Sequence, residues 1–551
     1  MRHHSAGRAT IGSVLLALAL FASLAPAPTL GAPAPVFPAG HEGYHTYDEM
    51  LANINAVIAA RPRVVSKRAI GQSHEGRTIW AVKISDNVGR DENEPEVLFE
   101  SLSHAREHLT VEQALRIIHL LADNYRAKAS SIENDLQRRV SDIVRSREIW
   151  IVPMVNPDGG QYDLGDGTEF RAWRKNRQPT FDATPIGVDL NRNWGFKWGC
   201  CGGSSGKPGS DTFRGPRAWS APEVAALRDF VLSRRINGRQ QIRAAISWHA
   251  FNEEIMWPYG YTKVDLPRTI TADDLDAFRA VGRGMAALNG YAAKQLSDLY
   301  VIDGGSGDWL YGDQRIFAFT IEMYPTVDVP TPRGFYPSDD VIQRETSRND
   351  RAVLYFLENA ACPYAAAGLV SRCGPLNEDF ETERGWTINP GGSDTATSGR
   401  FQRDIPASTS DGGGVKQLDY GFSGQAALVT GARPGSSPGA NDLDGGSTSA
   451  LSPAVTLGTA GGSGWRLQFR YAFAHDSSGT QDDYVRVLVN GSVVFVDRGQ
   501  PVNRNATWQL VDVSLAAFAG QQVQVRVEAN DGASASLVEV AVDDVRIFRG
   551  S

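Results

Sequence analysis

The segment Glu96–His108 reads EVLFESLSHAREH. Its apolar first half is typical of a buried strand, and Thr110–Tyr125, which follows, repeats apolar residues at helical spacing. The metal-capable side chains His104, Glu107 and His108 therefore fall at a turn between a strand and a helix. Because such a turn lets a sheet aim side chains into a crevice, we predict a metal site here.

Two arrangements of zinc ligands fit this motif. In one, His104 and His108 form an i, i+4 helical pair and Glu107 is the general base, which is the inverted H-x-x-E-H protease pattern. In the other, His104 and Glu107 are both ligands and the base comes from elsewhere. Zinc takes three protein ligands and keeps one open position. The first arrangement therefore needs a distant carboxylate, and the second needs a distant His and a distant Glu.

Length and composition indicate a soluble globular protein. The chain has 551 residues, of which 42% are hydrophobic and 21% are charged. Length alone predicts about three to four domains, and fewer if one of them is a large α/β domain. The net charge is −8 and no basic patch stands out, so we do not expect nucleic acid as a partner.

The N-terminus has the features of a secretory signal. Arg2 and Arg8 supply positive charge, and Ile11–Leu24 is an apolar run too short for a comfortable membrane span. We predict a signal peptide over residues 1–32, a secreted protein and no membrane span. The four cysteines then suggest disulfides. Cys362 with Cys373 is the favoured pair, whereas adjacent Cys200 and Cys201 form a vicinal bridge or reach a distant partner.

Strands and helices alternate between residues 41 and 363. Apolar runs predict strands at Thr78–Ser85, Glu148–Val155 (followed by a turn at Asn156–Gly159), Ile242–Trp248 and Ile316–Ile321. Helical patterns lie at Tyr47–Ala60, Ala221–Arg234, Ala272–Leu288 and Val341–Asn359. This alternation predicts an α/β domain with a mixed, largely parallel central sheet flanked by helices. His249 and Glu322 stand at strand ends, where sites collect in such sheets.

The composition changes after the α/β domain. We predict a short N-terminal segment over residues 33–40, a linker over residues 364–376 and an all-β sandwich over residues 377–551. The expected strands of the sandwich are Trp465–Phe473, Tyr484–Val489, Trp508–Val513, Val523–Glu528 and Val538–Phe548.

Two sets of acidic residues are candidates for structural Ca²⁺, with solvated loops as the equal alternative. The first set is Asp86, Asp91, Glu92, Glu94 and Glu96, and the second is Glu378, Asp442, Asp444, Asp543 and Asp544.

Several separated motifs between residues 41 and 363 occur in the order found in one family. They are His104-Ala-Arg-Glu107, Trp173–Arg177 (WRKNR), Asp189–Asn193 (DLNRN), Ser247-Trp-His249, Tyr300 with Asp303–Gly305 and Asp308-Trp309 after it, and Phe319-Thr-Ile-Glu322. On these motifs the chain resembles the zinc metallocarboxypeptidases, especially the secreted bacterial carboxypeptidase T type. The resemblance implies an α/β/α carboxypeptidase fold and peptide or protein substrates with a free C-terminus.

The resemblance also implies roles for single residues. His104, Glu107 and His249 are the expected ligands of one catalytic Zn²⁺, with water in the fourth position. Glu322 is the expected general base and Arg174 the expected oxyanion partner. Asp189 is expected to orient a ligand histidine. Asn191, Arg192 and Tyr300 match the clamp for the C-terminal carboxylate, and Arg106 and Arg171 match accessory substrate contacts.

Two other interpretations are weaker. The inverted arrangement gives no role to His249, Arg192 or Glu322, so we expect His108 to cap or pack at the helix start instead of binding metal. An inactive relative that only binds peptides or cell surfaces would lack a ligand or the base, and all of them are present here. In this family an inhibitory pro-segment is common. The domain begins near Gly40, so we expect an exported enzyme that needs no proteolytic activation.

Substrate preference depends on the pocket behind the clamp. In this family the floor draws on positions that are Gly260, Gly305 and Gly307 here, with Ile302 and Thr320 nearby. T-type relatives tend to carry an acid at the position of Gly305, and a buried cation needs such a partner. We therefore expect apolar or aromatic C-terminal residues to be preferred, and we expect Asp303 to organise the turn. The C-terminal domain resembles jelly-roll modules of secreted proteases, with a glycan or a protein surface as its expected ligand.

Overall fold

An eight-stranded mixed sheet organises the first part of the chain. The structure is a computed structural model that describes residues 36–92, 94–180, 187–236, 239–381, 383–412, 414–433, 435–459, 464–532 and 536–549; the expected signal peptide lies outside them. The strands run in the order β1-β2-β4-β3-β7-β10-β8-β9. Their bounds are β1 (Val65–Gln72), β2 (Thr78–Ile84), β3 (Glu96–Glu100), β4 (Glu148–Val152), β7 (Ile242–Asn252), β8 (Glu254–Trp257), β9 (Ala292–Gln295) and β10 (Phe317–Thr326).

The centre of the sheet is parallel and its flanks include antiparallel pairs. Strands β4, β3, β7 and β10 pair in parallel, whereas β1 with β2, β2 with β4 and β10 with β8 are antiparallel. The predicted mixed α/β sheet is therefore confirmed. Because parallel strands end at one edge, residues after β3, β7 and β10 are brought together.

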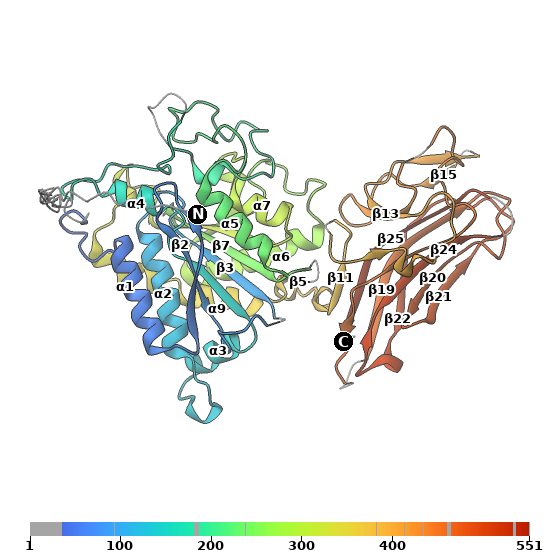
Figure 1. Cartoon of the computed structure of the whole chain (residues 1–551), viewed down its shortest axis with the longest axis horizontal. Coiled ribbons are helices and arrows are strands. Elements are labelled where there is room, and N and C mark those ends of the chain that lie inside the picture. Colours follow the sequence, from blue (N-terminus) through green and yellow to red (C-terminus); the bar gives the residue numbers. More distant parts are fainter. Residues whose placement is uncertain are drawn as a thin grey trace, which may run out of the picture.

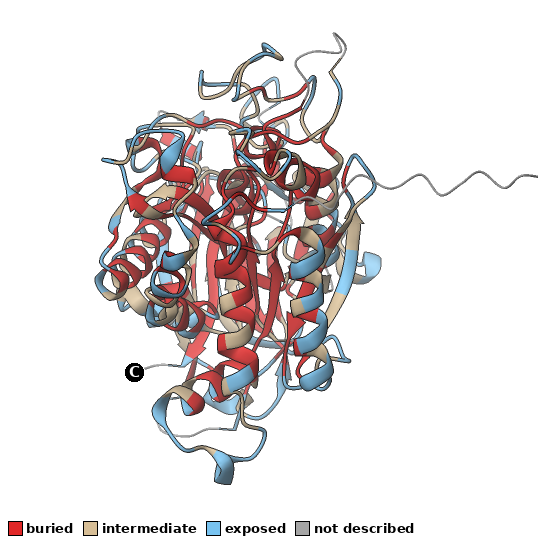
Figure 2. Cartoon of the chain, turned by 90° about the vertical axis from the view of Figure 1, so that its left-hand side faces the viewer, coloured by how far each residue is buried: buried red, intermediate tan, exposed pale blue. Residues whose placement is uncertain are grey.

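Helices cover both faces of this sheet (Figure 1). On one face lie α1 (Tyr47–Ala60), α2 (Leu109–Asn124), α3 (Asp135–Val144), α6 (Ala272–Asn289) and α9 (Asp350–Asn359); on the other lie α5 (Pro222–Ser233) and α7 (Ser306–Gly312). Successive strand residues alternate between the two cores, so that Val97 and Phe99 pack on the first face and Leu98 on the second. Figure 2 shows the buried strands between partly exposed helices.

Two local predictions were wrong. The expected helix Val341–Asn359 is divided into α8 (Ile342–Ser347) and α9, because the Asn349 side chain donates to the carbonyl of Glu345 and to Gln113 at the junction. The expected turn at Asn156 instead begins α4 (Pro157–Asp163). Asn156 Oδ1 accepts from the Gly159 N–H, and proline occupies the first helical position.

The C-terminal part is a sandwich of two antiparallel sheets around one core, as predicted. The first sheet contains β11 (Leu376–Glu378), β13 (Phe401–Asp404), β16 (Ala427–Thr430), β19 (Trp465–His475), β22 (Gln509–Ser514) and β25 (Val538–Arg549). The second contains β12 (Thr387–Ile388), β17 (Gly446–Leu451), β20 (Tyr484–Val489), β21 (Ser492–Arg498) and β24 (Val525–Asp531).

Ion pairs of two buried arginines join the sandwich to the α/β domain. Arg372 binds Asp273 of α6 at 2.8 Å and Asp544 of β25 at 3.0 Å. Arg315 pairs with Glu381 at 3.2 Å. Breaking such a pair leaves an uncompensated buried charge, so these contacts hold the two parts together. Of the helices described, none combines the length and the apolar character that crossing a membrane requires.

Candidate active site

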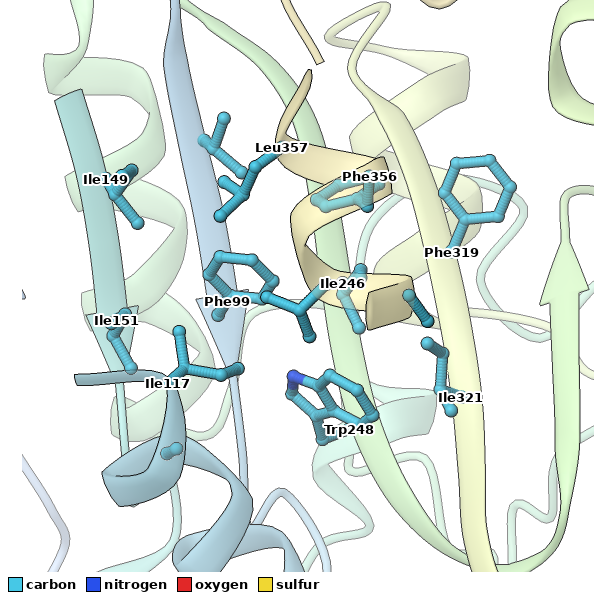
Figure 3. Packing of buried hydrophobic residues seen from close by; sticks show 14 of the residues in the cluster. Phe99, Ile117, Ile149, Ile151, Ile246, Trp248, Phe319, Ile321, Phe356 and Leu357 are labelled. Carbon is cyan, nitrogen blue, oxygen red and sulfur yellow. The ribbon is translucent and has the colours of Figure 1, made fainter. Parts of the chain in front are cut away.

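Three metal-capable side chains meet at the edge where β3 and β7 end. Glu107 Oε1 lies 2.7 Å from His104 Nδ1, and Glu107 Oε2 lies 2.9 Å from His249 Nδ1. The two Nδ1 atoms are 3.1 Å apart, and all three residues are buried. Trp248 and Ile321, which precede His249 and Glu322, are anchored in the core (Figure 3) and direct their neighbours to the opposite side.

The donor set fits a zinc ion. His104 Nε2 lies 3.3 Å from Asp189 Oδ1, and His249 Nε2 lies 3.0 Å from Ser247 Oγ. With the outer nitrogens as N–H groups directed at Asp189 and Ser247, both inner Nδ1 atoms present lone pairs toward each other and toward Glu107. Such lone pairs repel unless a cation lies between them. Two imidazoles and one carboxylate are a normal catalytic zinc set.

His108 is not part of this cluster. Its Nε2 lies 2.9 Å from Asp163 Oδ2, and its ring packs on the edge of Phe37. It occupies the N-cap position of α2 without a side-chain capping bond. Of the two expected roles, packing is the one observed.

Asp189 connects the metal cluster with Arg174. Its Oδ2 accepts from Arg174 Nε at 3.1 Å and lies 3.0 Å from Nη2, while Oδ1 faces His104. Burial acts to raise the pKa of Asp189, but Arg174, Arg192 and His104 outweigh it and hold the pKa well below its usual range. The carboxylate is therefore charged, and it orients both His104 and Arg174.

Glu322 lies directly across from His249 in the paired strands β7 and β10. Burial, followed by the nearby Glu107 carboxylate, raises the pKa of Glu322 to about 8 against the opposing effects of His249 and Arg174. A cation bound at the cluster would act in the opposite direction. Glu322 therefore lies beside the metal cluster, and its carboxyl group is not one of the three candidate metal ligands.

The expected clamp residues border the same site. Asn191 Nδ2 lies 3.4 Å from His249 Nε2, and Asn191 Oδ1 accepts from the Ser306 N–H. Arg192 is buried and donates through Nε to the carbonyl of Gly203 and through Nη1 to that of Asn191. Its Nη2 has no hydrogen-bond partner among the described residues. Tyr300 is 48% exposed, with its ring 5.9 Å from the Arg192 guanidinium.

The two accessory arginines differ in their surroundings. Arg106 stacks on Phe335 at 4.2 Å and lies 3.3 Å from Asp211. Arg171 lies on Tyr162 at 4.1 Å and donates to its carbonyl; none of these contacts reaches the metal cluster.

The three pocket glycines differ in the side chains they face. A Cβ at Gly260 would lie 3.0 Å from Leu296 and 3.2 Å from Ile302, and one at Gly305 would lie 3.3 Å from both Ile302 and Asn191 Oδ1. A Cβ at Gly307 would meet only Thr320, at 3.6 Å.

Sequence reasoning missed two side chains at this edge, Glu100 and Ser247. Glu100 is paired with Ser247, and Ser247 with Thr320, across neighbouring strands. Glu100 is fully buried, and burial raises its pKa against the opposing effect of the Ser247 and Ser306 hydroxyls. The sequence held one signal for Glu100, because this acid lies within an apolar strand that ends at the metal motif.

The structure does not support calcium at either acidic set. In the first set, Asp91 and Glu96 form a group of three carboxylates with Glu148, and Arg234 binds both of them, so a cation of the protein already occupies this group. In the second, Asp544 is paired with Arg372 and Arg546. None of the second set belongs to a group of three metal-capable side chains in the described residues.

These features define a class of metallopeptidase, and comparisons with known proteins agree. Residues 50–352, more than half of the chain, match the family described as zinc carboxypeptidase (peptidase M14), and the chain therefore belongs to this family. It is a zinc metallocarboxypeptidase, and His104, Glu107 and His249 form its zinc motif.

Individual relatives match a little over half of the chain. The chain is 47% identical to a zinc carboxypeptidase of Saccharothrix mutabilis subsp. capreolus over 326 residues, which are 59% of this chain and 71% of that protein. Identity to carboxypeptidase A1 of Bos taurus is 30% over 286 residues, 51% of this chain and 63% of that protein. The crystal structure of thrombin activatable fibrinolysis inhibitor superposes with a TM-score of 0.50 at 25% identity, covering 57% of this chain and 74% of that one.

Proposed function

We propose that this zinc carboxypeptidase is an exported enzyme, of the bacterial carboxypeptidase T type, that removes apolar or aromatic residues from free C-termini. The observation that carries the proposal is the buried Arg192 guanidinium, with Nη2 unpartnered among the described residues, beside Asn191 and the zinc motif. An arginine recognises a carboxylate through parallel N–H donors. Only a substrate whose chain ends here can present that carboxylate next to the metal.

The residues of the site divide the reaction between them. Bound zinc supplies Lewis acidity that polarises the scissile carbonyl. Glu322 accepts a proton from the attacking water and passes it to the leaving amine. Arg174, held by Asp189, donates to the oxygen on which negative charge develops. Arg192 and Asn191 bind the terminal carboxylate, and the exposed Tyr300 closes over it.

The preference for apolar residues rests on the walls of the pocket. Leu296, Ile302 and Met256 form one buried cluster beside Gly260. Of the neighbouring acids, Asp308 accepts from the N–H groups of Gly260 and Tyr261, and burial raises its pKa to about 7. Asp303 Oδ2 accepts from the N–H groups of Cys201 and Gly203, whereas its buried Oδ1 has no hydrogen-bond partner among the described residues.

Burying a ring or a branched side chain in this pocket gains about 2 kcal/mol. Burial raises the pKa of Glu100, and this disfavours its use as the charged partner of a cationic side chain. A panel of blocked dipeptides that differ only in the last residue tests this. We expect kcat/KM to be about thirtyfold higher for Phe or Leu than for Arg, and lowest for Glu. Equal values for Phe and Arg would contradict the apolar pocket. Loss of Arg cleavage in Glu100→Gln would then identify the acid responsible.

Export is supported by the cysteines as well as by the N-terminal sequence. All four cysteines are paired, as Cys200–Cys201 and Cys362–Cys373, which suits an oxidising compartment. We expect the protein in the culture medium, with its N-terminus close to residue 33 by mass spectrometry. Retention in the cell with an intact N-terminus would contradict export.

The sandwich is proposed as an accessory domain that binds a glycan or a protein surface. Deleting residues 377–551 should leave kcat/KM for dipeptides unchanged while it weakens retention on insoluble glycan or protein. Equal retention of the full and shortened chains would contradict this role. Because Arg315 and Arg372 would lose buried partners, folding of the shortened chain must be verified by circular dichroism.

A further inference from the structure

The loop that carries the Cys200–Cys201 disulfide packs directly against the substrate pocket. Both cysteines are exposed, whereas Asp303, which contacts the loop, is fully buried. Asp303 Oδ2 accepts from the Cys201 N–H at 2.9 Å and from the Gly203 N–H at 3.0 Å. One carboxylate oxygen of the side chain that precedes the pocket glycines is therefore held by backbone groups about a hundred residues earlier in the chain, while the buried Oδ1 has no hydrogen-bond partner among the described residues.

The same loop also holds the clamp arginine. The carbonyl of Gly203 accepts from Arg192 Nε at 2.9 Å. A Cβ at Gly203 would lie only 2.5 Å from the backbone nitrogen of Asp303, so the two segments touch without room for a side chain. One residue, Gly203, thus contacts both the clamp and the pocket wall.

A third contact joins the segment that follows Arg192 to the segment that follows Asp303. The Trp194 N–H donates to the carbonyl of Gly304 at 3.0 Å. Gly304 has φ +67°, and a Cβ there would lie 2.5 Å from the carbonyl oxygen of Arg192. The segments 191–194, 200–203 and 302–305 are therefore interlocked, and displacement of one moves the others.

We propose that Asp303 and the Cys200–Cys201 disulfide loop act as one positioning unit for the carboxylate clamp and the specificity pocket. A disulfide between adjacent residues closes a small ring that contains their peptide bond, and this restricts the direction of the Cys201 N–H. Opening the ring frees that N–H from Asp303 and releases the Gly203 carbonyl that orients Arg192. The zinc motif and Glu322 make none of these contacts. The unit therefore acts on substrate binding more than on the chemical step, and this inference rests on the proposed clamp role of Arg192.

The test uses the full-length zinc enzyme in a Cys362→Ser/Cys373→Ser background, in which a reductant acts only on Cys200–Cys201. A phosphine cleaves the S–S bond to two thiols and becomes the phosphine oxide with oxygen from water. A phosphine is chosen in place of a thiol reductant because thiols bind zinc. We expect KM for a free C-terminal peptide to rise about tenfold, while kcat stays within about twofold and zinc content is unchanged. Mass spectrometry after alkylation shows that the thiols at 200 and 201 have formed.

Asp303→Ala provides the second arm and keeps the test valid if the serine background does not fold. It should raise KM to a similar degree, and reduction should then add nothing, because both changes break one unit. An unchanged KM with fully reduced Cys200 and Cys201, or additive effects of reduction and Asp303→Ala, would overturn the inference. Arg192→Ala separates the two proposals. If it leaves KM unchanged, the clamp role fails, whereas if it raises KM and reduction does not, only the positioning unit fails.

Discussion

The substitution Asp189→Asn removes one buried negative charge while it preserves the size of the side chain. Asp189 is fully buried, and its Oδ2 lies 3.0 to 3.1 Å from two nitrogens of Arg174. Its Oδ1 accepts from the Asn191 N–H at 2.9 Å and lies 3.3 Å from His104 Nε2. An amide oxygen can still serve Asn191, so the backbone should keep its course.

Two losses follow from these contacts. Arg174 becomes a buried cation without its partner, which costs about 3–5 kcal/mol of unfolding free energy. His104 loses the carboxylate that fixes its tautomer, which weakens metal affinity by about 10- to 100-fold. Activity should fall further than zinc loss explains, because Arg174 is no longer aimed at the developing oxyanion.

Chelator competition measures the zinc affinity, and denaturant unfolding of the zinc-loaded protein measures the stability. Asp142→Asn is the matched control, because it makes the same charge change at an exposed residue near Arg138 and Arg145. It should alter stability by less than about 1 kcal/mol. If Asp189→Asn held zinc and unfolded as the control does, the role of Asp189 as a buried bridge would be wrong.

Three further predictions concern the base, the clamp and the domain junction. Glu322→Gln should retain one zinc per chain while kcat falls by about 10²- to 10⁴-fold, and turnover at the parent rate would exclude Glu322 as the base. Arg192→Ala should raise KM for free C-termini by about 10- to 100-fold without changing the slow cleavage of amidated peptides. Discrimination equal to that of the parent would contradict the clamp. Burial, outweighing Arg384 and assisted by Asp379, raises the pKa of Glu378 to about 7, so the folded state holds this proton over a range where the unfolded chain has lost it. The contribution of protonated Glu378 to the free energy of unfolding is fully present below the unfolded-state pKa and is lost as the pH rises toward 7. Glu378→Gln should therefore flatten the pH dependence of the free energy of unfolding in this range. An unchanged pH dependence would refute the raised pKa of Glu378.

Much of the α/β domain was predictable because its signals are local or periodic. The helix Tyr47–Ala60 was predicted with its observed bounds, and Thr46 and Glu49 form a capping box at its start. The placement of His249 and Glu322 at strand ends followed from a general rule, since parallel strands end at one edge of a sheet. The ligand set His104, Glu107 and His249 was implied by the family resemblance. Five strands of the sandwich, β19, β20, β22, β24 and β25, were also recognisable from their alternation, whereas the shorter strands before β19 were not predicted.

The remaining features depend on contacts between distant segments. The partner of Asp303 lies in the loop around Cys201, and nothing near Asp303 in sequence announces it. The break between α8 and α9 depends on Asn349 reaching Gln113 in another helix. The acidic loop suggested calcium because the sequence did not reveal that Arg234 would fill it. In each case a side chain finds its partner through the tertiary fold.

The zinc content of two histidine variants tests the central claim most directly. The structure brings His249 into contact with His104 and Glu107, and it pairs His108 with Asp163 instead. We predict that His249→Ala, purified without added metal, loses stoichiometric zinc and peptidase activity. His108→Ala should retain about one zinc per chain, as three protein ligands remain. Zinc loss in His108→Ala together with full retention in His249→Ala would contradict the account.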